Sequence, residues 1–470
     1  IGPQVAIVKS LASALCIGGG GSVGREGPIV QIGSALGSSL GSLIRVDEDR
    51  LRILVACGAA GGIAATFNAP LAGVFFAMEL ILRDFAAEAF GMVVLSSVTA
   101  SVIGRAAFGD TAFLHLPTFH VQHPGQYLVF VVLGALAGAV GVGFTRVLYL
   151  IEDACDALWR GPAWARPAVG GVALGALLLV LPEMYGVGYP VLDKGVSGAY
   201  SIGFVLVLMA GKMLATSLTI GIGGSGGVFA PSLFIGAMFG SAFGHGAAHV
   251  LPGVAGPSGA YALIGMGAVF AGAARAPITA VIIIFELTGD YTVILPLMAA
   301  IAVAAGVSKL ISRDTIYTLK LRRRGIDLDA AAPAALLPGR SLPDVMEPPP
   351  APMLADTPLE KVEQLLADAA HGALPVAESD GAYLGTVTAR AAAEALADRQ
   401  PATTQVRHLA GHGREVTVDT PLREALGALV AADSAGIAVL TADRTRLAGW
   451  ITHQSLLAAL HATHANPSDH

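Results

Sequence analysis

Residues 20–28 read Gly-Gly-Ser-Val-Gly-Arg-Glu-Gly-Pro, and a similar stretch returns at 223–231 as Gly-Gly-Ser-Gly-Gly-Val-Phe-Ala-Pro. The match continues past the proline, where an isoleucine and two glycines recur at equal spacing: Ile32, Gly33 and Gly37 against Ile235, Gly236 and Gly240. A second block repeats in the same order: Ala69-Pro70 precedes Glu79-Leu80, and Ala276-Pro277 precedes Glu286-Leu287. Two ordered blocks indicate a duplication. Duplicated halves with broken helices are typical of a transport site that lies between two repeats.

The composition is that of a membrane protein. Of the 470 residues, 54% are hydrophobic and only 13% are charged, and the mean hydropathy is +0.68. Soluble domains carry about twice that share of charge. The charges divide unevenly, with 29 in residues 1–310 and 33 in the shorter stretch 311–470. We therefore expect a multispan membrane region followed by a soluble region, and the net charge of −6 gives no reason to expect nucleic-acid binding.

Apolar stretches recur through the first region, and glycine and proline interrupt many of them. They lie at 5–20, 28–44, 53–82, 89–108, 127–151, 168–182, 202–222, 228–251, 260–274, 277–288 and 291–311. Several are shorter than the ~20 residues that cross a bilayer. Broken helices are tolerated in a membrane only where they line a cavity or are covered by protein. The pattern predicts a transporter or a channel.

The soluble region contains a pattern that appears twice. Residues 355–388 place a helix-like stretch before two short β-branched runs, and 418–452 repeat that order. This predicts a pair of α/β units. The domain boundaries that we predict are a membrane domain at 1–325, a linker at 326–337, α/β units at 338–400 and 401–463, and a tail at 464–470.

Each glycine-rich stretch ends in a proline that suits the first turn of a helix, Pro28 in one copy and Pro231 in the other. A helix N-terminus carries about half a positive charge and several free backbone N–H groups. Two such ends that face each other inside a membrane form an anion site without lysine or arginine. Partial charges also allow the anion to leave again.

Glu26 is an acid within this apolar region, and acids inside membranes are costly and usually functional. When ionised, its carboxylate can occupy the anion position itself; when protonated, it is neutral and can move away. The plainer alternative is a charge that complements the helix dipole. We favour the gate, because the equivalent position in the second copy is the apolar Phe229.

The motif Gly24-Arg25-Glu26-Gly27-Pro28 resembles the signature of the CLC family of chloride channels and anion/proton exchangers. Gly227-Val228-Phe229-Ala230-Pro231 resembles the partner motif in that family's second half, and residues 68–73 and the region around Tyr317 match as well. The resemblance covers nearly all of 1–325. The twin units at about 338–462 are similar to the paired cystathionine-β-synthase (CBS) domains that often follow this membrane region.

The resemblance implies an all-α multispan membrane domain with duplicated, inverted-repeat halves and broken helices, followed by a cytoplasmic α/β CBS domain pair. It also implies roles by position. Glu26 is the gating glutamate, the backbone amides of Val228 and Phe229 contact the central anion, and the Tyr317 hydroxyl donates to that anion. Without the resemblance, Tyr317 reads as an interfacial tyrosine beside a basic triplet.

The chain departs from the family pattern in three ways. The family's first anion-coordinating loop, which supplies a serine, lies before this motif, so we expect a fragment without its N-terminal spans. Exchangers often carry an internal proton-transfer glutamate where this chain has Leu80. For the neighbouring Glu79 we expect structural or vestibule contacts rather than a proton role, as for Glu286 in the second copy. CBS domains that bind adenine nucleotides often place an aspartate three residues after a Ser or Thr; here Ala391 follows Thr388 and Ser455 follows Thr452.

These departures shape the expected partners. Leucine cannot carry a proton, so either the chain is a passive channel or its protons take another route. For the CBS pair, a structural or dimerising role is at least as well supported as nucleotide binding, and we expect no required cofactor. We also expect no metal site, because His245 and His249, one helical turn apart, lack an evident third ligand.

The resemblance thus implies chloride transport by a homodimer in the cell membrane. The leading interpretation is a voltage- or pH-gated anion channel with a glutamate gate, and the alternative is a chloride/proton antiporter that uses a different proton route. The basic residues 322–324 place the CBS pair in the cytoplasm. We expect no enzyme, because an intramembrane metalloprotease needs a His-Glu-x-x-His helix that this sequence lacks. A third class, a membrane-anchored nucleotide sensor, is disfavoured, because spans that serve only as an anchor need no broken helices.

Overall fold

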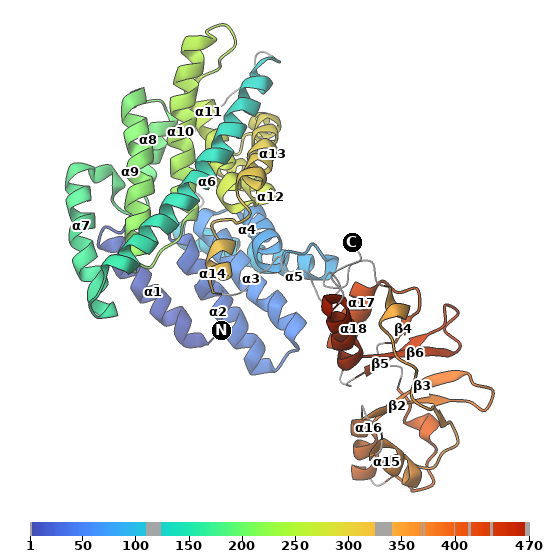
Figure 1. Cartoon of the computed structure of the whole chain (residues 1–470). Coiled ribbons are helices and arrows are strands. Elements are labelled where there is room, and N and C mark those ends of the chain that lie inside the picture. Colours follow the sequence, from blue (N-terminus) through green and yellow to red (C-terminus); the bar gives the residue numbers. More distant parts are fainter. Residues whose placement is uncertain are drawn as a thin grey trace. The chain divides into compact units, whose positions relative to one another are not determined.

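The computed structural model describes residues 2–109, 124–324 and 341–465, apart from 368, 370, 371, 399, 412–414 and 433–435. The chain divides into two compact units, Ile1–Ile326 and Asp327–His470 (Figure 1). The whole linker predicted at 326–337 lies outside the described residues.

All the regular elements in the described part of unit 1 are helices. Its elements are α1 (Pro3–Gly18), α2 (Glu26–Ile44), α3 (Glu48–Phe67), α4 (Pro70–Phe76), η1 (Ala77–Leu82), α5 (Ala87–Phe108), α6 (Gln126–Leu158), η2 (Ala163–Ala165), α7 (Arg166–Val180), η3 (Pro182–Met184), α8 (Tyr189–Val196), α9 (Ile202–Gly221), α10 (Phe229–Val250), α11 (Ser258–Ala274), α12 (Pro277–Thr288), η4 (Tyr291–Val293), α13 (Ile294–Ile311) and α14 (Thr318–Arg323). Within the described part of the chain, six helices are long and apolar enough to cross a membrane by length and composition.

These helices confirm the multispan prediction, with two differences. The stretch predicted at 53–82 breaks after Phe67, because Asn68 ends α3 in the left-handed conformation (φ 54°) and Pro70 opens α4. The short helix α8 lies in a region where we predicted no apolar element. Its eight residues carry three polar or charged side chains among them and follow two left-handed glycines, Gly186 and Gly188.

The duplication is visible in the backbone, since α1–α5 and α9–α13 follow the same order. Gly20 and Gly223 hold equivalent left-handed conformations, with φ of 100° and 95°. Each is followed by a glycine amide that bonds back to the preceding helix, Gly21 to Cys16 and Gly224 to Thr219, both at 2.8 Å. The two motifs therefore fold alike despite their different sequences.

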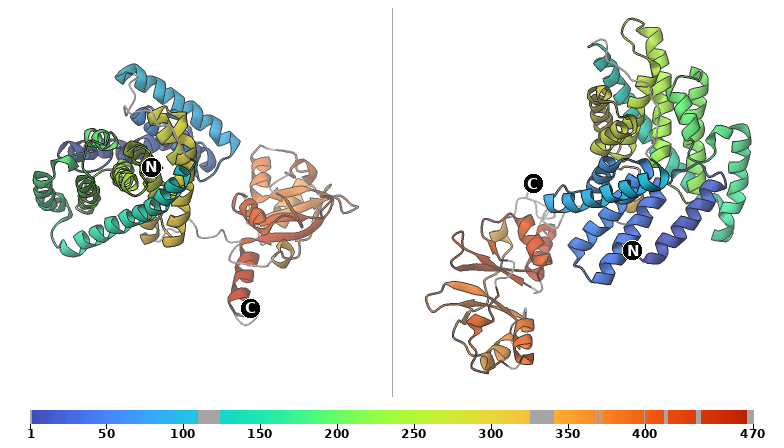
Figure 2. Two further views of the ribbon diagram at one scale, coloured as in Figure 1. Left: turned by 90° about the horizontal axis from the view of Figure 1, so that it is seen from above. Right: turned by 180° about the vertical axis from the view of Figure 1, so that it is seen from behind.

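Glycines allow the helices of each repeat to cross closely. A Cβ on Gly33 of α2 would lie 2.0 Å from the Gly58 carbonyl of α3, and one on Gly236 of α10 would lie 2.3 Å from the Gly265 carbonyl of α11. These backbones leave no room for a larger residue, so the pairs α2–α3 and α10–α11 lie side by side (Figure 2).

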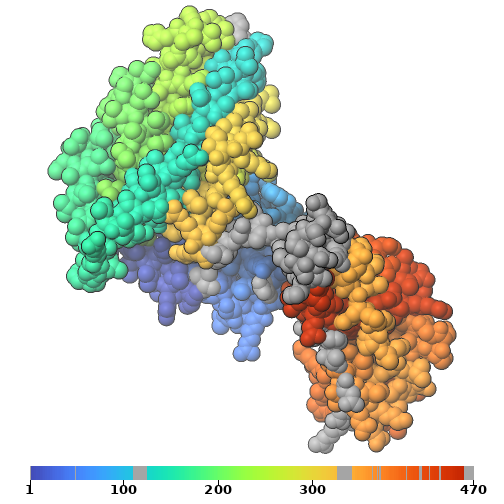
Figure 3. Space-filling view, viewed as in Figure 1, coloured from blue at the N-terminus to red at the C-terminus, as the bar shows by residue number. Residues whose placement is uncertain are grey.

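The short helix α11 explains how a broken span is accommodated. All its residues from Gly259 to Ala274 are buried, so protein surrounds a helix of 17 residues on every side. The long helix α6 crosses in front of it and packs along α13, as the space-filling view shows (Figure 3). Together these elements form one large apolar core around α10 and α11.

Unit 2 consists of two copies of one α/β arrangement, which confirms the predicted pair of units. The first copy contains η6 (Leu342–Asp344), β1 (Met353–Leu354), α15 (Leu359–Ala367), β2 (Ala373–Ala377), β3 (Tyr383–Thr388) and α16 (Ala389–Ala397). The second contains η7 (Val406–His408), β4 (Val416–Thr417), α17 (Leu422–Val430), β5 (Gly436–Leu440), β6 (Leu447–Thr452) and α18 (His453–Ala465).

Both sheets have the same topology. The middle strand pairs parallel with the strand before it and antiparallel with the strand after it, in the orders β1-β2-β3 and β4-β5-β6. Both middle strands are buried along their whole length. Trp450 of β6 is fully buried in a small cluster that also contains Ala373 of β2, so the two copies share a core.

Candidate functional site

Glu26 is the first residue of α2, and its side chain is only 1% exposed. Its Oε1 accepts a hydrogen bond from the Tyr189 hydroxyl at 3.3 Å. Its Oε2 has no hydrogen-bond partner among the described residues, although the backbone N–H groups of Glu26 and Ala230 lie close to the carboxylate. The helix N-terminus stabilises negative charge at this position.

The carboxylate lies where the two repeated loops meet. Gly24 and Gly227 form a two-residue antiparallel bridge, with the Gly24 amide 2.9 Å from the Gly227 carbonyl and the Gly227 amide 2.6 Å from the Gly24 carbonyl. A Cβ on Gly24 would lie 1.8 Å from Glu26 Oε2, and one on Gly227 would lie 3.3 Å from it. The carboxylate thus fills the space between the N-termini of α2 and α10.

The other residues of the first motif support this geometry. The Arg25 side chain donates to the Thr66 carbonyl at 3.1 Å and lies over the Tyr189 ring, 5.6 Å from its centroid. A Cβ on Gly27 would lie 2.9 Å from the Gly227 Cα, so the two loops touch through bare backbone. Pro28 is buried in the first turn of α2.

The second motif presents an apolar face at the equivalent position. Phe229 opens α10 as Glu26 opens α2, and its ring is buried between those of Phe67, Phe76 and Phe270, with centroids 5.4, 6.3 and 4.5 Å away. Val228 precedes the helix as its N-cap. Ala230 and Pro231 are buried in the first turn, so only the backbone of this helix end is polar.

Lys212 of α9 lies behind the first loop and is fully buried. Its Nζ donates to Ser22 Oγ at 2.9 Å and to the Gly186 carbonyl at 2.8 Å, and it lies over the Phe234 ring. The neighbouring Thr216 hydroxyl donates to the Ser22 carbonyl at 2.7 Å. These bonds fix the loop that leads to Glu26. Sequence analysis missed Lys212, although it is the one charged residue in the apolar stretch 202–222.

Tyr317 lies on the segment between α13 and α14 and packs against the same core as Val228 and Phe229. Its hydroxyl makes no hydrogen bond within the described residues, and its amide is bonded to Thr315 Oγ1 at 3.3 Å. The Tyr317 side chain is thus a partly buried polar group at the edge of an apolar core. The structure brings Glu26, Val228, Phe229 and Tyr317 to the same region of unit 1.

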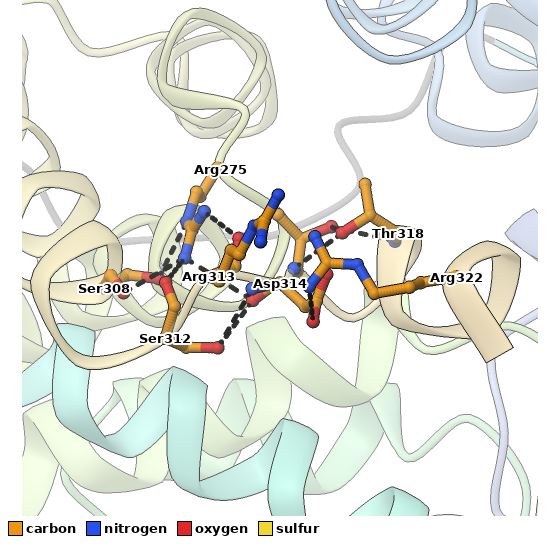
Figure 4. A network of polar contacts seen from close by, with 8 residues as sticks. Arg275, Ser308, Ser312, Arg313, Asp314, Thr318 and Arg322 are labelled. Atoms are coloured by element: carbon orange, nitrogen blue, oxygen red, sulfur yellow. Dashed lines mark hydrogen bonds and ion pairs between the residues drawn. The ribbon is translucent and has the colours of Figure 1, made fainter. Parts of the chain in front are cut away.

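The segment that carries Tyr317 is held by Arg275, which ends α11 in the left-handed conformation. Its guanidinium donates to the Arg313 carbonyl at 2.9 Å, to the Ser308 carbonyl at 3.1 Å and to the Ser312 carbonyl (Figure 4). Arg275 is the counterpart of Asn68 in the first repeat. Both residues end their helices in the left-handed conformation, so the backbone of Arg275 follows from its position in the repeat.

Helix α14 is anchored to the end of α6 and to Asp314. The Tyr149 hydroxyl donates to the Ile316 carbonyl at 2.7 Å, next to Tyr317. Three ion pairs act on α14 itself: Arg322 with Asp314 at 2.8 Å, Arg323 with Asp153 at 2.6 Å and Lys320 with Glu152 at 3.5 Å.

Glu79 and Glu286 make reciprocal contacts between the repeats. Glu79 accepts bonds from the Ile278 and Thr279 amides at the start of α12, at 3.2 and 2.9 Å, and from the Thr279 hydroxyl at 2.7 Å. Glu286 accepts bonds from the Leu71 and Ala72 amides at the start of α4, at 2.9 and 2.7 Å. Each carboxylate thus caps a helix of the other half, as expected for structural residues.

Leu80 follows Glu79 within the π-helical turn η1 and packs against the large core. The position at which exchangers of the family often carry a proton-transfer glutamate is therefore apolar here. Sequence analysis also missed Tyr189, because α8 lies outside every apolar stretch that it identified. The Gly-Tyr-Pro sequence at 188–190 was the available signal for a helix start.

In unit 2 the two threonines considered for nucleotide binding are helix caps. Thr388 Oγ1 accepts from the Ala391 amide at 3.2 Å, and Thr452 Oγ1 accepts from the Ser455 amide at 2.9 Å. In unit 1, His245 Nδ1 lies 2.8 Å from the Ser241 carbonyl on its own helix.

Comparisons with known proteins agree with this geometry. The family model described as "Voltage gated chloride channel" matches residues 1–309, and the model of the CBS domain matches residues 343–398. A duplicated helical membrane domain with a buried glutamate between two helix N-termini is therefore that of an anion transport protein. The chain belongs to the CLC family, with a C-terminal CBS region.

The curated relatives that the chain matches carry chloride transport in their names. The chain is 36% identical over 326 residues to the H⁺/Cl⁻ exchange transporter ClcA of Vibrio campbellii, which covers 68% of this chain and 70% of the relative. It is 36% identical over 335 residues to a protein of Ralstonia nicotianae named as a ClcB-like chloride channel protein, with 70% and 77% covered. A slow cyanobacterial Cl⁻/H⁺ antiporter of known structure matches with a TM-score of 0.61 and 31% identity over 69% of this chain and 77% of its own.

Proposed function

We propose that this chain is a chloride/proton antiporter in which the Glu26 carboxylate alternates with chloride at one anion position. The observation that carries the proposal is the place of this carboxylate between the N-termini of α2 and α10, where it fills the space between Gly24 and Gly227. The exchanger relatives support this alternative over the passive channel with which the sequence analysis led.

The proposed cycle follows from charge. An ionised Glu26 is held by the helix dipoles and excludes chloride from that position. Protonation removes its charge, so the side chain leaves and chloride takes its place. The anion then meets the backbone N–H groups of Val228 and Phe229 and the Tyr317 hydroxyl. These donors offer partial charges rather than a full positive charge, so the anion can be released again.

Protons must reach Glu26 without a carboxyl group at residue 80. Leu80 cannot bind a proton, and the carboxylate of Glu79 accepts three hydrogen bonds from α12. We infer that the inner part of the proton route uses water rather than an acidic side chain at this place. Leu80 is also the observation that favours a second candidate function, a passive chloride channel gated by Glu26.

The proposal extends to topology and assembly. The basic residues at the end of α14 support a cytoplasmic location for the CBS region by the positive-inside rule. The apolar residues exposed on α1, α5 and α7 suit contact with lipid. The family resemblance supports a homodimer in the cell membrane, with one transport site in each subunit.

The CBS region has a structural role in this account. Thr388 and Thr452 cap their own helices, and no aspartate stands three residues after either of them. We propose that transport requires no nucleotide and no other cofactor, because helix dipoles and one carboxylate provide the chemistry.

Coupled proton movement tests the proposed function. Purified protein is reconstituted into liposomes with high internal chloride, and valinomycin with potassium balances the charge. An antiporter drives protons inward as chloride leaves, so the pH of a weakly buffered outer solution rises before any protonophore is added. Chloride efflux without a change in outer pH would contradict antiport and would support the passive channel.

A further inference from the structure

Besides the N-termini of α2 and α10, a third helix contacts Glu26. This helix, α8, is not part of the repeated motifs. Tyr189 is the first residue of α8, and its hydroxyl lies 3.3 Å from Glu26 Oε1. Glu26 Oε2 lacks a hydrogen-bond partner among the described residues. The Tyr189 bond is therefore a main attachment of the carboxylate to an element outside α2 and α10.

The surrounding backbone fixes the direction of this hydroxyl. Gly188 precedes Tyr189 with φ of 90°, and a Cβ there would lie 3.2 Å from the Phe234 ring and 3.4 Å from Lys212 Nζ. Lys212 binds the Gly186 carbonyl on one side and Ser22 on the other, so one buried amine joins the loop before α8 to the loop before Glu26. The Arg25 guanidinium covers the Tyr189 ring.

This bond acts differently on the two forms of the gate. A hydroxyl that donates to an ionised carboxylate makes a charge-assisted hydrogen bond, which is stronger than a bond between neutral groups. A protonated carboxyl is neutral and gains less from the same donor. The hydroxyl thus favours the form of Glu26 that is ionised, buried and blocking.

We propose that Tyr189 is a positioning residue that latches the Glu26 carboxylate in its blocking position and so slows chloride entry when Glu26 is ionised. The proposal rests on the proposed role of Glu26 as the gate. Four charged or titratable groups interact with Glu26: Arg25 directly before it in the chain, Tyr189 on α8, Lys212 on α9 and Tyr317 before α14. Replacing Tyr189 by phenylalanine keeps the other three and the ring under Arg25, so it tests the hydroxyl alone.

The test is chloride efflux from liposomes that contain the full chain, measured at neutral and at acidic pH. We expect Tyr189→Phe to raise the efflux rate at neutral pH by about fivefold, as the loss of one such bond implies, and to leave the acidic rate unchanged. Tyr185→Phe is the matched control, because the Tyr185 hydroxyl donates to the Gly18 carbonyl and not to Glu26. It should behave as the wild type does.

A second background separates this proposal from the proposed function. In Glu26→Gln protein the added Tyr189→Phe change should have no effect, because there is no ionised carboxylate to latch. If Glu26→Gln itself keeps the wild-type pH dependence, the gate is wrong. Suppose instead that Glu26→Gln loses the pH dependence of efflux. The latch alone is then wrong if Tyr189→Phe has the wild-type efflux rate, or if it accelerates efflux equally at both pH values.

Chloride binding provides a second readout, which a purely structural role would not change in this direction. By isothermal titration in detergent at neutral pH, Tyr189→Phe should bind chloride about fivefold more tightly, because a weaker latch competes less with the anion. Should the phenylalanine variant not yield folded protein, Tyr189→Leu must show the same gain confined to neutral pH. A loss of affinity in either variant overturns the latch.

Discussion

A buried carboxylate without a full set of partners dominates the chemistry at the residue scale. Burying an ion costs several kcal/mol unless charges or dipoles replace the lost water. Around Glu26 that replacement comes from the N-terminus of α2, the nearby Ala230 amide and the Tyr189 hydroxyl. Glu26 Oε2 has no hydrogen-bond partner among the described residues. We therefore expect the binding of one proton to decide whether the side chain stays in this position or leaves it.

Glu26→Gln tests this balance, because the amide is neutral at every pH and resembles the protonated acid. We expect chloride efflux to persist and the ratio of its rates at acidic and neutral pH to fall to about one. Proton uptake driven by chloride should vanish, because residue 26 can no longer bind a proton. Arg25→Gln is a useful control, since it keeps the carboxylate and changes a neighbouring charge.

An unchanged pH dependence of efflux in Glu26→Gln would remove the gate from the account. Persistent proton uptake in that variant would show that another residue carries the proton.

The elements of the two repeats support each other through reciprocal caps. Glu79 of η1 receives the first amides of α12, and Glu286 of α12 receives the first amides of α4. Each broken helix thus has its exposed N–H groups satisfied by the other half, as burial in a membrane requires. These caps hold α4 with η1 in register against α12, which packs beside α4.

Removing either cap should lower stability and leave proton coupling intact. We expect Glu79→Ala and Glu286→Ala each to cost about 1–2 kcal/mol, as the loss of a cap does elsewhere. The measurement is thermal unfolding in detergent, with Glu88→Ala as control, since Glu88 is an exposed carboxylate in the first turn of α5. If the proton route ran through Glu79, Glu79→Ala would abolish proton uptake while Glu286→Ala would not.

Sequence alone predicted the repeated loops because glycine, proline and their spacing determine the local backbone. It also predicted a structural role for Glu79, which the contacts to α12 confirm. It could not show which amides Glu79 meets, because Ile278 and Thr279 lie about 200 positions away along the chain. It missed Tyr189, because α8 is a short amphipathic helix that a search for apolar stretches passes over.

The helix break inside the apolar stretch 53–82 was also not predicted from the sequence. Asn68 and Pro70 belong to the stretch 68–73 that resembles the family, but the apolar character of the whole of 53–82 conceals the helix end between them. Lys212 was visible as a lone charge in an apolar segment. Its importance depends on Ser22 and Gly186, which reach it from two other parts of the chain.

For the whole molecule, transport and the CBS region belong to separate compact units. The proposed anion site is built from residues of unit 1, and unit 2 has apolar cores of its own. We therefore expect a chain that ends at residue 324 to transport chloride at about the full-length rate, within a factor of two or so. Efflux from liposomes checks this, and size-exclusion chromatography shows whether the shortened chain is folded. A folded shortened chain without flux would make unit 2 essential.

The central claim is that chloride and proton movements are coupled in one molecule, and the reversal potential in planar bilayers measures it most directly. With a chloride gradient and equal pH on both sides, we predict a reversal potential displaced from the chloride equilibrium value. With equal chloride and a pH gradient, we predict one that differs from zero. A reversal potential that follows the chloride equilibrium value under every combination of gradients would contradict the account.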